Sequence, residues 1–165
     1  MEYATFFIRD DLFGIPLFLV QEISRIADIY PVPGHDPRIE GVVNLRGRTA
    51  VVLNLSTCLY SQGSSQSHAE RPKLIILETK DWIGEKFKAL AEQAFEEQIV
   101  LMVDDVYKII DDEKQDFFEP PAHVHEKYVE GVMKNGNTLI TLLSIKKLLE
   151  DLIPQEENTG YDNRK

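Results

Sequence analysis

The chain has 165 residues, of which 43% are hydrophobic and 28% are charged, as expected for one globular domain or for two very small subdomains that share a core. The formal net charge of −10 argues against nucleic acid and anionic membranes as partners, because both need a basic surface. No apolar run approaches the roughly 20 residues of a membrane-spanning helix, and residues 1–9 do not resemble a signal peptide, so we expect a cytoplasmic protein.

The first elements are predicted to be strands. Residues 3–9 and 13–18 flank the turn signal Asp10-Asp11 and predict a β-hairpin. Residues 20–26 place apolar side chains at spacings that fit both a strand and a helix, so their type stays open. Residues 30–37 contain three prolines and a glycine, which predicts an extended connector.

A second hairpin and a short helix complete the first half. Residues 41–45 and 49–55 are β-branched and apolar, and they are joined at Arg46-Gly47-Arg48. Residues 56–60 predict a short helix, with Asn54 or Ser56 as its N-cap. Residues 61–72 are rich in serine and glutamine, which predicts a connector between two halves of the chain.

The second half begins with predicted strands at 73–79 and 98–103. Between them, apolar residues recur at helical spacing and predict an inserted amphipathic helix near 83–96. A strand at 106–110, a proline connector at 119–121 and a hairpin within 128–143 follow. A C-terminal helix is expected near 145–153, with Ser144 as its cap and Pro154 as its stop. We expect residues 154–165 to form a flexible tail.

The chain contains an internal repeat. Residues 38–59 align without a gap on residues 128–149, and a shorter echo relates residues 19–23 to 102–106. The identical pairs of the longer repeat are Glu40/Glu130, Gly41/Gly131, Val42/Val132, Leu53/Leu143 and Leu59/Leu149. Two copies predict two strand-rich subdomains, roughly 10–68 and 72–150, within one domain of residues 1–153. The first strand precedes both subdomains and is free to pack against either one.

The two copies differ at the hairpin turn. The first copy carries Asn44-Leu45-Arg46-Gly47, and the second has residues 134–137 with the sequence Lys-Asn-Gly-Asn. A requirement of the fold should appear in both copies, so the arginine motif predicts a function. Arg46 also has a structural interpretation, as a hairpin-end residue that pairs with Glu22 or Glu40, and both roles can hold together. Gly41 is present in both copies, which favours a structural role.

These features resemble the CheW family of chemotaxis coupling proteins over about residues 3–153. The resemblance rests on Val20-Gln21-Glu22-Ile23, Pro31-Val32-Pro33, Gly41-Val42-Val43-Asn44-Leu45-Arg46-Gly47 and Val103-Asp104, in this order. It implies a mainly β fold with two five-stranded β-barrel subdomains, related by a pseudo-twofold axis and carrying short helices. Departures from the family pattern fall at Glu40, Asn54 and Ser56, and at the inserted helix.

The resemblance also implies a function. Such domains act as non-catalytic adaptors between the cytoplasmic tips of methyl-accepting chemotaxis receptors and the regulatory domain of a CheA-type histidine kinase, within membrane-associated receptor arrays. The residues that it assigns to receptor or kinase binding are Val20, Glu22, Gly41, Asn44 and Arg46.

Other functions remain open at this point. One alternative is a CheW-like adaptor of a non-flagellar pathway that controls pili or development. An alternative of a different class is a small β-barrel ligand sensor or enzyme, which would need a convergent polar pocket. We expect no cofactor and no metal, because His123 and His125 lack further nearby ligands. Cys58 is predicted to be a small buried hydrophobic residue.

Overall fold

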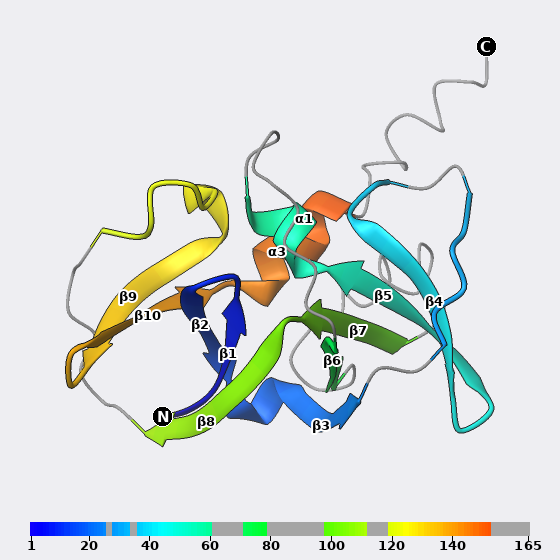
Figure 1. Cartoon of the computed structure of the whole chain (residues 1–165), viewed down its shortest axis with the longest axis horizontal. Coiled ribbons are helices and arrows are strands. Elements are labelled where there is room, and N and C mark those ends of the chain that lie inside the picture. Colours follow the sequence, from blue (N-terminus) through cyan, green and yellow to red (C-terminus); the bar gives the residue numbers. More distant parts are fainter. Residues whose placement is uncertain (26–27, 34–35, 61–70, 79–97, 112–118, 153–165) are drawn as a thin grey trace, which may run out of the picture.

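The computed structural model describes residues 1–25, 28–33, 36–60, 71–78, 98–111 and 119–152, which form two five-stranded sheets and a few short helices (Figure 1). The terminal sheet, in the order β8-β1-β2-β10-β9, contains β1 (Glu2–Ile8), β2 (Asp11–Pro16), β8 (Asp105–Asp111), β9 (Val129–Asn135) and β10 (Thr138–Leu143). The central sheet, in the order β3-β6-β7-β5-β4, contains β3 (Val20–Arg25), β4 (Ile39–Leu45), β5 (Arg48–Asn54), β6 (Lys73–Leu77) and β7 (Gln98–Val103). The prediction of a mainly β fold with two five-stranded units is therefore confirmed.

The two halves of the sequence exchange their first hairpins. Each half runs as a hairpin, a single strand, and a second hairpin that leads into a helix. The hairpin β1–β2 joins the sheet of the second half through parallel pairing of β2 with β10, and β6–β7 joins the sheet of the first half through parallel pairing of β7 with β5. The sheets thus divide the strands differently from the expected subdomains at 10–68 and 72–150, because long-range pairing decides which strands are neighbours.

Closed barrels were expected, but in each sheet the described residues of the two end strands are not hydrogen-bonded to each other, which leaves an open seam between them. Among the described residues, β3 does not pair with β4, and β8 does not pair with β9. The outer edge of β4 pairs instead with Tyr30, through an isolated antiparallel bridge to Val42. Of residues 20–26, whose type was left open, Val20–Arg25 forms strand β3, and residue 26 lies outside the described residues.

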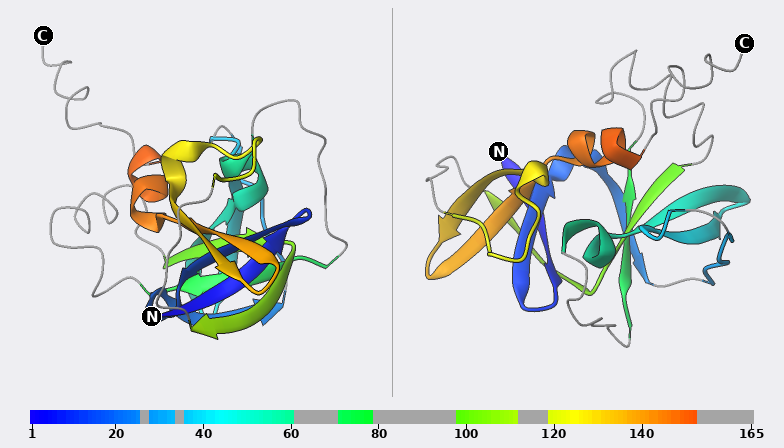
Figure 2. Two further views of the ribbon diagram at one scale, coloured as in Figure 1. Left: turned by 90° about the vertical axis from the view of Figure 1, so that its left-hand side faces the viewer. Right: turned by 90° about the horizontal axis from the view of Figure 1, so that it is seen from above.

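One hydrophobic core is shared by the two sheets. Buried side chains from both sheets and from the helices α1 (Leu55–Leu59) and α3 (Ile145–Leu152) form a single cluster, and these helices lie between the sheets in Figure 2. A smaller cluster lies against the other face of each sheet. Because both faces are covered, runs such as Leu74–Leu77 and Ala50–Leu53 are buried without alternation.

The two copies of the repeat fold alike. In each copy the residue between the paired positions, Glu40 or Glu130, is the extra residue of a β-bulge. Each hairpin then leads into a helix whose cap is a side chain: Asn54 Oδ1 accepts from the Thr57 amide at 3.2 Å, and Ser144 Oγ accepts from the Lys147 amide at 3.2 Å. The capped C-terminal helix confirms the prediction near 145–153, whereas the predicted inserted helix near 83–96 and the predicted tail lie outside the described residues.

Candidate functional site

The β4–β5 hairpin turns through a two-residue loop that forces Arg46 into an unfavourable backbone conformation. Arg46 has φ +52° and Gly47 has φ +82°, the pattern of a type I′ turn. The side chain of Asn44 supports the turn, because its Oδ1 accepts a hydrogen bond of 2.9 Å from the Gly47 amide. Residues other than glycine are uncommon at positive φ, and such strained residues often cluster at functional sites; among the described residues, Arg9 at φ +58° is the other example.

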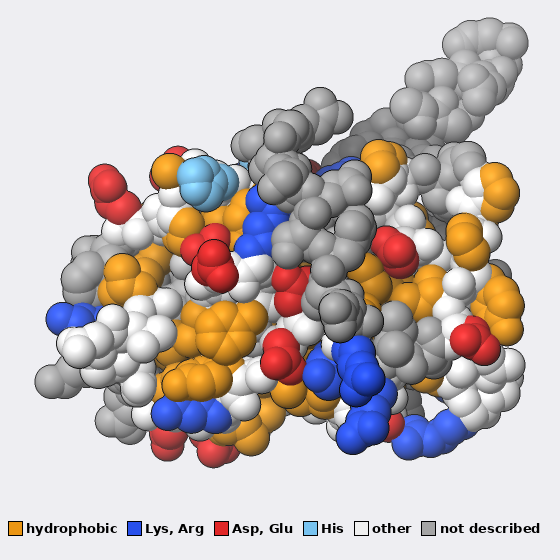
Figure 3. Space-filling view, viewed as in Figure 1, with side chains coloured by type: hydrophobic (Ala, Val, Ile, Leu, Met, Phe, Trp, Pro, Cys, Tyr) orange, Lys and Arg blue, Asp and Glu red, His pale blue; other side chains and the backbone are white. Residues whose placement is uncertain are grey.

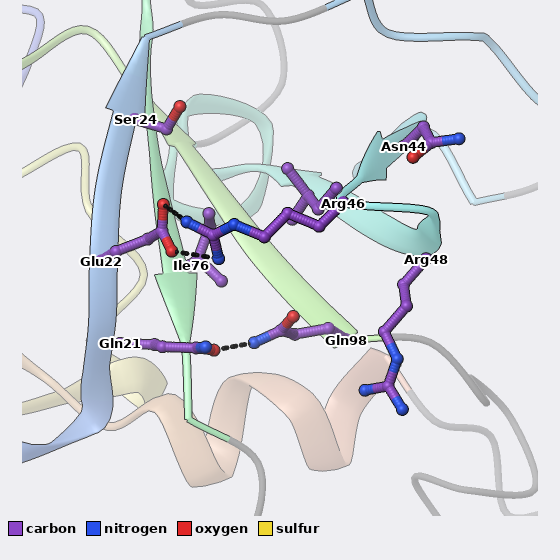
Figure 4. Close-up of a pocket in the computed structure, with 9 residues that line it drawn as sticks. Gln21, Glu22, Ser24, Asn44, Arg46, Arg48, Ile76 and Gln98 are labelled. Atoms are coloured by element: carbon purple, nitrogen blue, oxygen red, sulfur yellow. Dashed lines mark hydrogen bonds and ion pairs between the residues drawn. The ribbon is translucent and has the colours of Figure 1, made fainter.

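The guanidinium of Arg46 reaches back to the edge strand of the same sheet. Its Nη1 lies 2.7 Å from Glu22 Oε1, and its Nη2 donates to Oε2 at 3.1 Å (Figure 4). This two-pronged pair connects β3 to the β4–β5 turn across the seam that the backbone ladders leave open. The Arg46 side chain is 75% exposed in the pair, and that of Glu22 is 33% exposed. Both therefore stay accessible to a partner, as the dual interpretation of Arg46 requires.

The ion pair crosses a shallow hollow of about 310 Å³ between β3, β6, β7 and the hairpin tip. Its lining includes three long polar residues that were not predicted to bind a partner, namely Gln21, Arg48 and Gln98. The Gln98 side chain donates to the Gln21 side chain and, at 3.0 Å, to the Leu77 carbonyl. The sequence could have indicated Gln21, which lies inside the Val-Gln-Glu-Ile segment, and Arg48, which lies beside the Arg46 turn. Gln98 reaches the hollow only through the pairing of β7 with β5 and β6.

The five predicted binding residues do not form one group. Glu22, Asn44 and Arg46 all line the hollow. Val20 begins β3 and packs, partly buried, against the shared core. Gly41 is buried near the opposite end of β4 and has no side chain to offer to a partner. The structure therefore brings together three of the predicted residues and places the other two in supporting positions.

The other sheet lacks the equivalent ion pair. The repeated hairpin has Gly136 where the first has Arg46, with φ +64°. When the sheets are aligned through their parallel pairs, β5–β7 with β10–β2, Lys108 takes the position of Glu22. The shorter sequence echo was therefore out of register, because β3 corresponds to residues 106–111 and not to 102–106. Neither member of the pair is needed for the fold of the second copy.

A separate polar network joins the two copies at their contact. Asp36 accepts two hydrogen bonds from the Arg38 guanidinium, at 2.9 and 2.6 Å, and this pairing holds the pKa of Asp36 below its usual value. Arg38 also lies 3.4 Å from the hydroxyl of Tyr128, its own counterpart in the repeat, and that hydroxyl donates to Asp151 at 2.5 Å. Contact between equivalent residues is expected close to a twofold axis. The network secures the arrangement of the halves at a distance from the hollow.

Cys58 lies beneath this network and is chemically protected. Its side chain is only 2% exposed, and burial raises the pKa of its thiol to about 12. The thiolate needed for nucleophilic chemistry is therefore scarce at neutral pH. In the described ranges of the chain, no helix is long and apolar enough to cross a membrane.

Comparison with known proteins places the chain in a family. The family model for the CheW-like domain matches residues 2–152. Chemotaxis protein CheW of Treponema pallidum is 22% identical over 152 residues, 89% of this chain and 81% of the relative. Chemotaxis protein CheW of Thermotoga maritima is 26% identical over 156 residues, 94% of this chain and 91% of the relative.

A solved structure shares the fold. The scaffolding protein TtCheW from Thermoanaerobacter tengcongensis superposes with a TM-score of 0.69 at 21% identity, covering 89% of this chain and 86% of that protein. The family match extends over both sheets, the shared core and the Arg46 turn. The chain therefore belongs to the CheW-like domain family of chemotaxis coupling proteins.

Proposed function

We propose that this protein is a non-catalytic adaptor that couples the cytoplasmic tips of chemoreceptors to a CheA-type histidine kinase within receptor arrays. The observation that carries the proposal is the Arg46 turn. An exposed arginine is held at positive φ beside Glu22, and the second copy of the same hairpin replaces it with Gly136. A side chain that the fold does not need, kept in a strained conformation, is best explained by recognition.

The chemistry of the hollow suits recognition of a protein surface. Arg46 presents planar donors that can engage a carboxylate or a main-chain carbonyl. The lining of the hollow also offers amide and hydroxyl side chains, a second arginine and two apolar side chains. Figure 3 shows Lys and Arg side chains gathered over β3 and toward the β4–β5 hairpin, although the chain carries a net charge of −10. This local reversal of charge favours an acidic partner surface.

The adaptor mechanism is differential binding. The names of the relatives, chemotaxis protein CheW, and the description of the structural neighbour as a scaffolding protein support a role in assembly. A coupler transmits a signal only when it binds one state of a receptor or kinase more tightly than the other, because equal affinity shifts no equilibrium. Glu22 and Arg46 would then fix the register of the bound partner.

The first experiment measures binding of purified receptor tips and of the kinase regulatory domain to Arg46→Ala. We expect receptor affinity to fall by about 5- to 100-fold, as for the loss of a charge-assisted contact of 1–3 kcal/mol. Lys134→Ala is the matched control, because it removes an exposed cation from the corresponding hairpin of the terminal sheet. Equal affinity of Arg46→Ala and the control would contradict the binding role.

The bridging role has its own test. Receptor tip, kinase and this protein are mixed and sedimented together. An adaptor should give a ternary complex, because its two partners must occupy separate surfaces. Competition between receptor and kinase for one site would refute the proposal.

A further inference from the structure

Gly41 is in contact with the backbone of a distant segment. Its φ is +153°, and a Cβ built on it would lie 2.4 Å from the Tyr30 carbonyl oxygen and 2.9 Å from the carbonyl carbon. No side chain fits at such distances without moving the neighbouring backbone. Gly41 is also buried. Gly41 therefore has no side chain to offer to a partner, and the segment that it contacts is one route by which it can affect binding.

That segment, residues 28–33, is here called the strap. Tyr30 donates from its amide to the Val42 carbonyl at 2.8 Å and accepts from the Val42 amide at 3.0 Å, so the strap lies on the outer edge of β4. Ile29 anchors the strap, because it packs against the smaller hydrophobic cluster of the central sheet. Tyr30 itself is 58% exposed.

The outer side of the strap is apolar and is unsuited to pairing with a further strand. Pro31 and Pro33 are exposed, and proline offers no amide to pair with a further strand. In Figure 3, hydrophobic side chains follow the right-hand margin, where the strap runs beside β4. The strap thus presents one aromatic and two proline side chains to solvent in an acidic protein.

No such strap is found in the described part of the second copy of the repeat. Gly131 is not among the residues at positive φ. Among the described residues, β9 has no counterpart of the Tyr30 bridge, and the second connector pairs instead with the end of α1, through a bridge between Val124 and Tyr60. Within the described ranges, the strap thus occurs only on the sheet that also carries Arg46.

We propose that Gly41 is a positioning residue that holds the strap on β4, so that Tyr30 and the Arg46 turn form one continuous receptor-binding surface. The proposal rests on the adaptor function above. Val42 and Arg46 are four residues apart along the hairpin, which corresponds to roughly 13 Å at the rise of a strand. An α-helix that lies along the hairpin covers this distance in about nine residues, at a rise of roughly 1.5 Å per residue, so one helical segment of a receptor can touch both places. Tyrosine is a frequent centre of binding energy in such surfaces.

A double-mutant cycle tests the link between the two residues. Tyr30→Ala and Gly41→Ala should each weaken binding of purified receptor tip by about tenfold. The double variant should bind no more weakly than either single variant, because both changes remove the same contact. Arg46→Ala combined with Tyr30→Ala should instead lose affinity further. Unchanged receptor affinity of Tyr30→Ala, or additive losses in the first pair, would overturn the proposal.

A second variant covers the case in which Gly41→Ala does not fold. Ile29→Ala leaves Gly41 intact but removes the anchor of the strap, and it should reproduce the binding loss of Tyr30→Ala while the protein stays folded. Amide exchange of the free protein reports the strap directly: the Tyr30 and Val42 amides should be protected in the wild type and should exchange faster in Ile29→Ala. A strap that is released without any change in receptor affinity would refute its role in binding. Absence of receptor binding by the wild type would instead refute the adaptor function, while the exchange data would still report on the strap.

Discussion

Replacing Arg46 by glycine should separate the requirements of the fold from those of recognition, because the two act in opposite directions at this residue. A left-handed conformation costs an L-residue about 1–2 kcal/mol, and glycine relieves most of that cost. The lost ion pair with Glu22 is worth about 0.2–1 kcal/mol, since the Arg46 side chain is 75% exposed. Arg46→Gly should therefore leave the free energy of unfolding unchanged or raise it by up to about 1 kcal/mol.

Arg46→Ala is the informative comparison. It loses the same ion pair but keeps the positive φ, so its free energy of unfolding should fall by about 0.5 kcal/mol. The two variants should thus differ by about 1 kcal/mol, or about 2–4 °C in Tm for a chain of this size. Urea and thermal unfolding measure the difference, and receptor binding should be equally weakened in both variants.

The second copy of the hairpin supplies the control. Gly136 already occupies the corresponding position with φ +64°, so Gly136→Ala should lower the free energy of unfolding by about 1 kcal/mol or more. A loss of more than about 1 kcal/mol in Arg46→Gly would refute the reasoning, because the ion pair would then be a structural clamp across the open seam. The retention of arginine would need no functional explanation in that case.

Two further predictions concern the helix caps and the ion pair between Asp36 and Arg38. Asn54→Ala and Ser144→Ala each remove a helix cap and should each lower the free energy of unfolding by about 1 kcal/mol. Chemical denaturation measures both losses, and a variant as stable as the wild type would show that its cap was wrongly assigned. Arg38 lowers the pKa of Asp36 in the folded state, so the stability from this pair is present above the ordinary aspartate pKa and is lost as the pH falls below it. Asp36→Asn should flatten the decline in stability between about pH 5 and pH 3, and unfolding curves parallel to the wild type across that range would contradict the pairing.

Local pattern was sufficient to predict most of the described elements, although the type of residues 20–25 stayed open. The hairpins, the C-terminal helix and its cap at Ser144 follow from apolar periodicity and turn residues, which depend on near neighbours in the chain. The repeat at residues 38–59 and 128–149 revealed that the fold contains two similar units. The contrast between Arg46 and Gly136 pointed to the candidate functional hairpin, because a fold requirement would have appeared twice.

Only the tertiary structure decided which strands are neighbours. Parallel pairing of β5 with β7 and of β10 with β2 exchanges hairpins between the halves, and no local pattern encodes such pairings. The same long-range contacts bring Gln98 and Arg48 to Glu22, and they place the Tyr30 carbonyl against Gly41. The sequence could therefore identify Gly41 as a glycine present in both copies, but the reason for its positive φ lies in a segment that reaches it only after the sheet has formed.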